Sequence, residues 1–77
     1  MKYNTGELVE LSDHVELSGN MTGVIVVIIE DSKYSKSHPK EEWGYLESGI
    51  LVLSDQAGLI HYPHIPKEIK LINKDNI

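Results

Sequence analysis

Six consecutive apolar residues, 24–29, form the longest hydrophobic run in the chain. All six are valine or isoleucine, residue types that favour strands, and a continuous run of this length predicts a strand covered on both faces. Because the chain is short, we expect at least one of Ile25, Val27 and Ile29 to need cover from the following loop, from Tyr3 or from a second copy. Cover from within the chain is the favoured explanation, and a homodimer through these three residues is the alternative.

The rest of the chain shows short strand-like segments separated by turn residues. Strands are predicted at residues 6–11, 14–18, 21–29, 50–53, 59–62 and 69–72, with a further short apolar segment at 43–46. A turn is predicted at 18–20, because glycine and asparagine tolerate positive φ, and another at 54–58. Two nearby prolines allow only a single helical turn at 66–68, before the last strand. No segment has the apolar spacing of a long amphipathic helix, so the predicted class is all-β.

Residues 30–42 form a polar stretch between two predicted strands. The only large apolar side chain in it is Tyr34, and it contains one proline. This composition predicts an exposed loop. Loops of this length are uncommon inside compact domains and tend to be functional.

Five or six short strands favour a small, partly open β-barrel, because closure hides the strand edges that would otherwise pair with other chains. The stretch GELVELSDHVELSGNMTGVIVVI, residues 6–28, resembles the opening of KOW-type SH3-like barrels, with a glycine start, a polar break and a glycine-initiated apolar strand. Residues 48–72 are similar to the second half of small SH3-like proteins of tailed phages. The resemblance implies a phage or mobile-element accessory protein, located in the host cytoplasm or the virion.

Length and composition narrow the function further. The 77 residues allow one domain, with a core expected over about residues 6–72 and a frayed tail at 73–77. The absence of cysteine excludes disulfides and a thiolate zinc site. The start of the chain does not resemble a signal peptide, and the apolar run is too short for a membrane helix, so a soluble cytoplasmic protein is expected.

The charge balance argues against nucleic-acid binding. Twelve acidic residues oppose seven basic ones, all of them lysine, and the net charge is -5. Proteins that bind nucleic acids gather lysine and arginine on one face to neutralise phosphates. The chain is acidic where KOW modules of ribosomal and transcription factors are typically basic, so the nucleic-acid binding that this resemblance implies is only a minor alternative here.

Histidines and adjacent carboxylates are the candidate chemical groups. His61 and His64 could converge around Pro63 on a metal ion, with Glu68 or an acidic loop residue as a third ligand, but a partly solvated pair at a strand end is the favoured interpretation. Adjacent carboxylates on an exposed loop lack the cleft that acid–base catalysis needs. No motif of a nucleophile or phosphate loop is present in the sequence, so we expect no enzyme, no metal and no cofactor.

Aromatic residues in the long loop and the last hairpin are the candidate binding residues, because tryptophan and tyrosine provide much of the energy of protein interfaces. The predicted contact residues are Tyr34, Trp43, Tyr45 and Tyr62, with Glu41 and Glu42 steering the partner. In the alternative interpretation, Trp43 caps a small core and the tyrosines shield strand edges.

The sequence therefore predicts a non-enzymatic module for protein interaction or structure. Its partner would be another protein or a second copy of the chain. One alternative is an acidic inhibitor that blocks a nucleic-acid-binding surface of a host protein, motivated by the net charge and the absence of arginine. A second alternative is KOW-like nucleic-acid binding.

Overall fold

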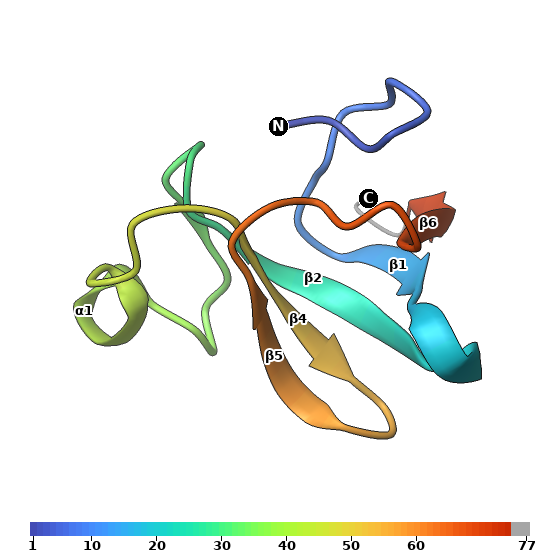
Figure 1. The fold of residues 1–77 in the computed structure, drawn as a ribbon. Coiled ribbons are helices and arrows are strands. Elements are labelled where there is room, and N and C mark those ends of the chain that lie inside the picture. The colour runs from blue at the N-terminus through green and yellow to red at the C-terminus, as the bar shows by residue number, and fades with distance from the viewer. Residues whose placement is uncertain (75–77) are drawn as a thin grey trace.

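The structure is a computed structural model that describes residues 1–74 (Figure 1). One antiparallel sheet has the strand order β5-β4-β2-β1-β6, and β3 pairs with β2 as well. The elements in chain order are β1 (Asp13–Glu16), the 3-10 helix η1 (Ser18–Asn20), β2 (Thr22–Ile28), β3 (Lys33–Tyr34), α1 (Lys40–Trp43), β4 (Ile50–Ser54), β5 (Gly58–Tyr62) and β6 (Lys70–Lys74). The predicted all-β class is confirmed.

The long apolar strand β2 lies at the centre of the sheet and pairs with β1 on one side and with β4 on the other (Figure 1). It is entered through η1, where Gly19 and Asn20 both have positive φ, of 72° and 63°, as the predicted turn requires. The β4–β5 turn is also formed as predicted. Its Ser54 hydroxyl accepts hydrogen bonds from the backbone N–H groups of Gln56 and Ala57.

A β-bulge in β2 divides the apolar run between two hydrophobic clusters. Ile25 pairs with Val52 on β4 but Val27 pairs with Leu51, which leaves Val26 as the extra residue. The bulge interrupts the strict alternation of side chains, so Ile25 and Val27 lie in different clusters although they are two residues apart.

The main cluster lies on one face of the sheet and receives residues from most of the chain. Its buried members are Tyr3, Val9, Val15, Leu17, Ile25, Ile28, Ile50, Val52 and Ile69. The second cluster lies on the opposite face, called here the outer face. Its buried members are Val26, Val27, Ile29 and Leu51, and residues of the long loop pack on it.

These clusters answer the question of what covers the apolar run. Ile25, Val27 and Ile29 are exposed by only 1, 0 and 8% within a single chain. The main cluster includes Tyr3, and the second cluster is covered from the long loop, so cover from within the chain is confirmed. These three side chains therefore present almost no surface in the single chain.

Four segments differ from the sequence predictions. Residues 6–11 do not form a strand; Leu8 makes an isolated bridge with Lys2, and the segment between them turns back on itself. Residues 66–68 form a hydrogen-bonded turn rather than a helix, closed by Ile69 N–H donating to the Pro66 carbonyl. The 30–42 loop contains β3 and the start of α1. The last strand continues through Lys74, and residues 75–77 of the predicted tail lie outside the described residues.

Over residues 1–74, no helix has the length and apolar character needed to cross a membrane.

Candidate functional site

The loop between β2 and β4 folds back over the outer face and carries the candidate site. β3 attaches the start of this loop to β2, because Tyr34 pairs with Val27 and Ser35 N–H donates to the Val26 carbonyl at 3.0 Å. α1 is a single helical turn that starts after Pro39 and is closed by the Trp43 N–H donating to the Pro39 carbonyl at 3.1 Å. Figure 1 shows α1 to one side of the sheet, at the end of the loop that leads into β4.

Three aromatic side chains of this loop form what we call the aromatic cap: Tyr34, Trp43 and Tyr45. Tyr34 and Trp43 pack against the second cluster and are half-buried. Tyr45 is 73% exposed and stacks on Trp43, with ring centroids 6.4 Å apart and an interplanar angle of 26°. The cap therefore has a structural layer against the sheet and an outer ring that faces solvent.

Trp43 has a second aromatic neighbour, and its indole nitrogen is buried. The His38 ring lies 6.1 Å from it, tilted by 40°, and its Nδ1 is within 3.0 Å of the Ser37 hydroxyl. The Trp43 indole Nε1 is buried and has no hydrogen-bond partner among residues 1–74. A buried indole N–H without an acceptor is costly, which indicates that packing against the second cluster holds the ring in place.

The two glutamates predicted to steer a partner lie beside the aromatic cap. Glu41 and Glu42 occupy α1, adjoining Trp43 in sequence, and both side chains are exposed. Neither forms an ion pair with another described residue. Their charges are therefore available to a partner that approaches the cap.

Tyr62 does not belong to this site. It lies on β5 opposite Ile50 and packs against the main cluster, on the other face of the sheet. The structure thus brings together five of the six predicted contact residues on one loop and separates the sixth from them. Tyr62 is half-buried on the edge strand β5, where the alternative interpretation had the tyrosines shield strand edges.

The outer face remains apolar beyond the cap. Val24, Leu53 and Leu59 face one another across β2, β4 and β5 in a single cross-strand row. Leu59 packs against the second cluster, whereas Leu53 is 43% exposed. An apolar strip therefore extends from the cap across three strands, and the sequence did not reveal it because its residues come from different strands.

The weak metal candidates are not brought into a ligand set. The His61 Nε2 lies 2.9 Å from the Ser48 backbone carbonyl, and both His61 and His64 are exposed. Within residues 1–74, no group of three or more histidine, aspartate or glutamate residues could hold a metal ion.

A buried carboxylate, Asp13, is the most prominent polar feature that sequence reasoning missed. Its side chain is fully buried and accepts hydrogen bonds from the Tyr3 hydroxyl at 2.7 Å and the Glu10 N–H at 2.9 Å. Lys74 Nζ lies 3.2 Å from Asp13 Oδ2 and 3.0 Å from Glu10 Oε1. The network joins the N-terminal segment, β1 and β6, and Lys74 stands 61 residues after Asp13 in the sequence.

The pKa values of Tyr3 and Lys74 are both raised in this network. Burial, followed by the hydrogen bond to Asp13, raises the pKa of Tyr3 far above its usual value, so the phenol stays protonated. Partial desolvation lowers the pKa of Lys74, but its hydrogen bonds with Glu10 and Asp13 outweigh this effect and raise that pKa overall. The lysine therefore remains charged, and the network clamps the N-terminal segment and β1 to β6.

The aromatic cap is the candidate functional site on the basis of its geometry alone. No family model, curated protein or solved structure matches the chain.

Proposed function

We propose that the chain is a non-enzymatic protein-interaction module that binds a protein partner through the aromatic cap and the adjoining apolar strip. The observation that carries the proposal is the 73% exposure of Tyr45 on top of a half-buried Trp43. A large aromatic side chain held by stacking loses little conformational entropy on binding, and such residues are common anchors of interfaces.

The charges beside the cap indicate the chemistry of the partner. Glu41 and Glu42 are exposed and unpaired among the described residues, next to an aromatic surface. Complementary charges steer association and suppress wrong partners. The partner is therefore a protein that presents an apolar side chain to Tyr45 and a basic residue close to it.

We also propose that the sheet closes as an SH3-like small barrel. The strand order β5-β4-β2-β1-β6 supports this, because the first strand, β1, pairs with the last one, β6, and β2, β4 and β5 continue from β1 as an antiparallel meander. The main cluster takes residues from β1, β2, β4 and the segment before β6, as expected for a sheet curled around one core. In this architecture the outer face is the convex side.

A comparative pull-down tests the proposed function. Tagged wild-type protein and three variants would be incubated with bacterial lysate, and retained proteins quantified by mass spectrometry. Tyr45→Ala removes the exposed ring, Glu41→Gln/Glu42→Gln removes the charges, and Ile72→Ala is the matched control, because Ile72 is 53% exposed on β6, away from the cap. Thermal denaturation verifies that all variants remain folded.

We expect a partner that is retained by wild type and by Ile72→Ala, and lost from Tyr45→Ala. The double glutamine variant should retain less of it at low salt, where charge steering is strongest. Equal retention by Tyr45→Ala and wild type would refute the assignment of the cap. Retention of the untagged chain by its tagged copy would make the partner a second copy of this protein.

A further inference from the structure

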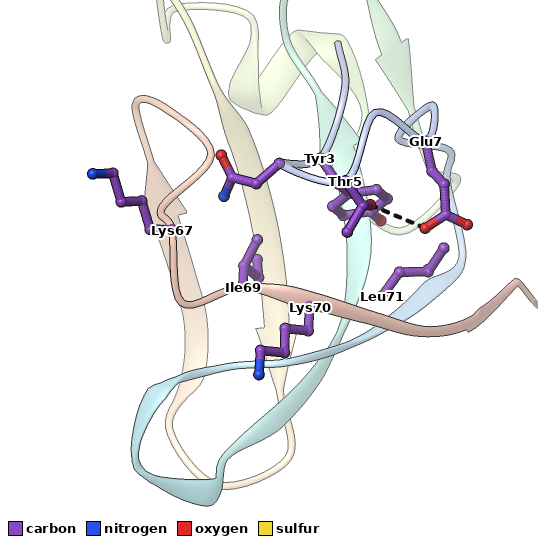
Figure 2. A pocket seen from close by; sticks show the side chains of 8 residues that line it. Tyr3, Thr5, Glu7, Lys67, Ile69, Lys70 and Leu71 are labelled. Atoms are coloured by element: carbon purple, nitrogen blue, oxygen red, sulfur yellow. Dashed lines mark hydrogen bonds between the residues drawn. The ribbon is translucent and has the colours of Figure 1, made fainter.

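A pocket of about 300 Å³ lies between the N-terminal turn and the segment that leads into β6. It is remote from the aromatic cap, since its walls adjoin the main cluster and the cap covers the second one. Figure 2 shows Tyr3, Thr5, Glu7 and Leu71 on one side of it and Lys67 and Ile69 on the other. The lining residues are Tyr3, Asn4, Thr5, Glu7, Lys67, Ile69, Lys70 and Leu71.

Both walls of the pocket are held by backbone hydrogen bonds. In the N-terminal turn, Tyr3 N–H donates to the Glu7 carbonyl and Gly6 N–H to the Tyr3 carbonyl, each at 2.9 Å. Across the pocket, Ile69 N–H donates to the Pro66 carbonyl. The Asn4 side chain ties the two walls together, because its Nδ2 donates to the same carbonyl at 3.1 Å. A pocket formed in advance binds a ligand without the cost of ordering its walls.

The floor of the pocket is apolar. Tyr3 and Ile69 are exposed by only 4 and 3%, and Leu71 packs beside them against the main cluster. The Tyr3 hydroxyl donates a 2.7 Å hydrogen bond to Asp13, so Tyr3 lines the pocket with its ring rather than with its hydroxyl. This floor suits a short aliphatic or aromatic body, and the volume is at the lower end of the range for small-molecule sites.

The rim carries two free positive charges. Lys67 and Lys70 are exposed and form no hydrogen bond or ion pair with the other described residues. Figure 2 shows their side chains reaching outward on either side of Ile69. Among the described residues that line the pocket, only Glu7 is acidic, and it accepts a hydrogen bond from the Thr5 hydroxyl at 3.0 Å. Two of the seven lysines of a chain with net charge -5 thus border one small pocket.

We propose that this pocket binds a small organic carboxylate, with its apolar body on the Tyr3–Ile69 floor and its carboxylate at Lys67 and Lys70. The floor excludes a fully hydrated ion such as inorganic phosphate as the preferred ligand, because such an ion would gain nothing from apolar contact. The two lysines exclude a cationic ligand. The site is independent of the aromatic cap, so its failure would leave the proposed protein interaction intact.

A titration followed by heteronuclear NMR of the 15N-labelled chain tests this site. The probes are hexanoate, 1-hexanol and hexylamine, which share a six-carbon body and differ in charge. We expect hexanoate to bind in the millimolar range, with chemical-shift changes centred on the backbone amides of residues 3–7 and 67–71. The alcohol should bind about fivefold more weakly and the amine more weakly still.

Two double variants separate local charge from net charge. Lys67→Gln/Lys70→Gln should reduce the affinity for hexanoate to that for 1-hexanol. Lys33→Gln/Lys36→Gln makes the same change in net charge on the long loop and should leave binding unchanged. Equal affinity for the three probes, shifts centred elsewhere, or equal effects of the two double variants would each overturn the proposal. All four lysines are exposed, so the variants keep the folded core.

Discussion

Removal of the Asp13 carboxylate is expected to destabilise the protein strongly. The group is fully buried. It accepts hydrogen bonds from the Tyr3 hydroxyl and the Glu10 N–H and forms an ion pair with Lys74. Asp13→Ala leaves the buried Tyr3 hydroxyl and the Glu10 N–H without their acceptor, while Lys74 keeps its ion pair with Glu10. A buried donor left without its acceptor costs about 1–3 kcal/mol, and this substitution leaves two such donors. A chain of this size has a free energy of unfolding of about 5–10 kcal/mol, so the loss would be a large part of it.

Tyr3→Phe isolates the contribution of the Tyr3 hydroxyl to the free energy of unfolding. Phenylalanine keeps the ring in the main cluster but removes the 2.7 Å hydrogen bond to Asp13. A hydrogen bond to a charged group contributes about 1.5–3 kcal/mol. In a double-mutant cycle, the two substitutions together should cost less than the sum of their separate effects, because both remove the same bond.

Urea denaturation at pH 7, followed by Trp43 fluorescence and circular dichroism, measures these free energies. Asp55→Ala is the matched control. Asp55 also accepts a hydrogen bond from a hydroxyl, that of Thr22 at 3.0 Å, but it is exposed, so its loss should cost less than about 1 kcal/mol. If Asp13→Ala cost no more than Asp55→Ala, the clamp described here would not stabilise the fold.

Three further predictions concern the core, a turn and alkaline pH. Leu51→Ala should lower the free energy of unfolding by about 2–5 kcal/mol in urea denaturation, because Leu51 is 2% exposed in the second cluster; a loss below 1 kcal/mol would contradict the packing described. Gly49→Ala should be far more destabilising than Gly58→Ala in thermal denaturation, although both glycines have positive φ, because a Cβ at Gly49 would collide with the Tyr62 carbonyl oxygen and one at Gly58 would meet open space. Stability should fall above pH 10, because Tyr3 and Lys74 hold their protons more tightly in the folded protein than in the unfolded chain. Tyr3→Phe should make that fall shallower in urea titrations at several pH values, and an unchanged slope would contradict this origin.

The sequence predicted the elements whose signals are local. Residues 24–28 of the apolar run lie in β2 (Thr22–Ile28), and the turn at 18–20 forms where glycine and asparagine stand. It did not predict the bulge at Val26, because an extra residue in a strand depends on the pairing with β4 and leaves no signature in an all-apolar run. A period of two would have placed Val27 on the face of Ile25, whereas the bulge moves it to the second cluster.

The candidate site was predicted in its residues but not in its arrangement. Five contact candidates lie within twelve residues of one another, so the loop itself brought them together. Tyr62 follows them in the sequence, but the register of β5 turns it to the other face. Asp13 occupies what the sequence suggests is a polar break, and its burial depends on Tyr3 and on Lys74, which stands 61 residues away. No pattern within a short window contains that information.

The pairing of β1 with β6 also determines the order in which the sheet can form. Leu53 and Leu59 pair across a short turn, whereas Asp13 and Lys74 pair across a separation of 61 residues. Closing the larger loop costs more chain entropy, and pairings of this kind slow folding. We therefore expect β2, β4 and β5 to assemble first and β6 to arrive last. Until it does, β1 presents an open edge beside the apolar Val15, and this late intermediate is the form most vulnerable to aggregation.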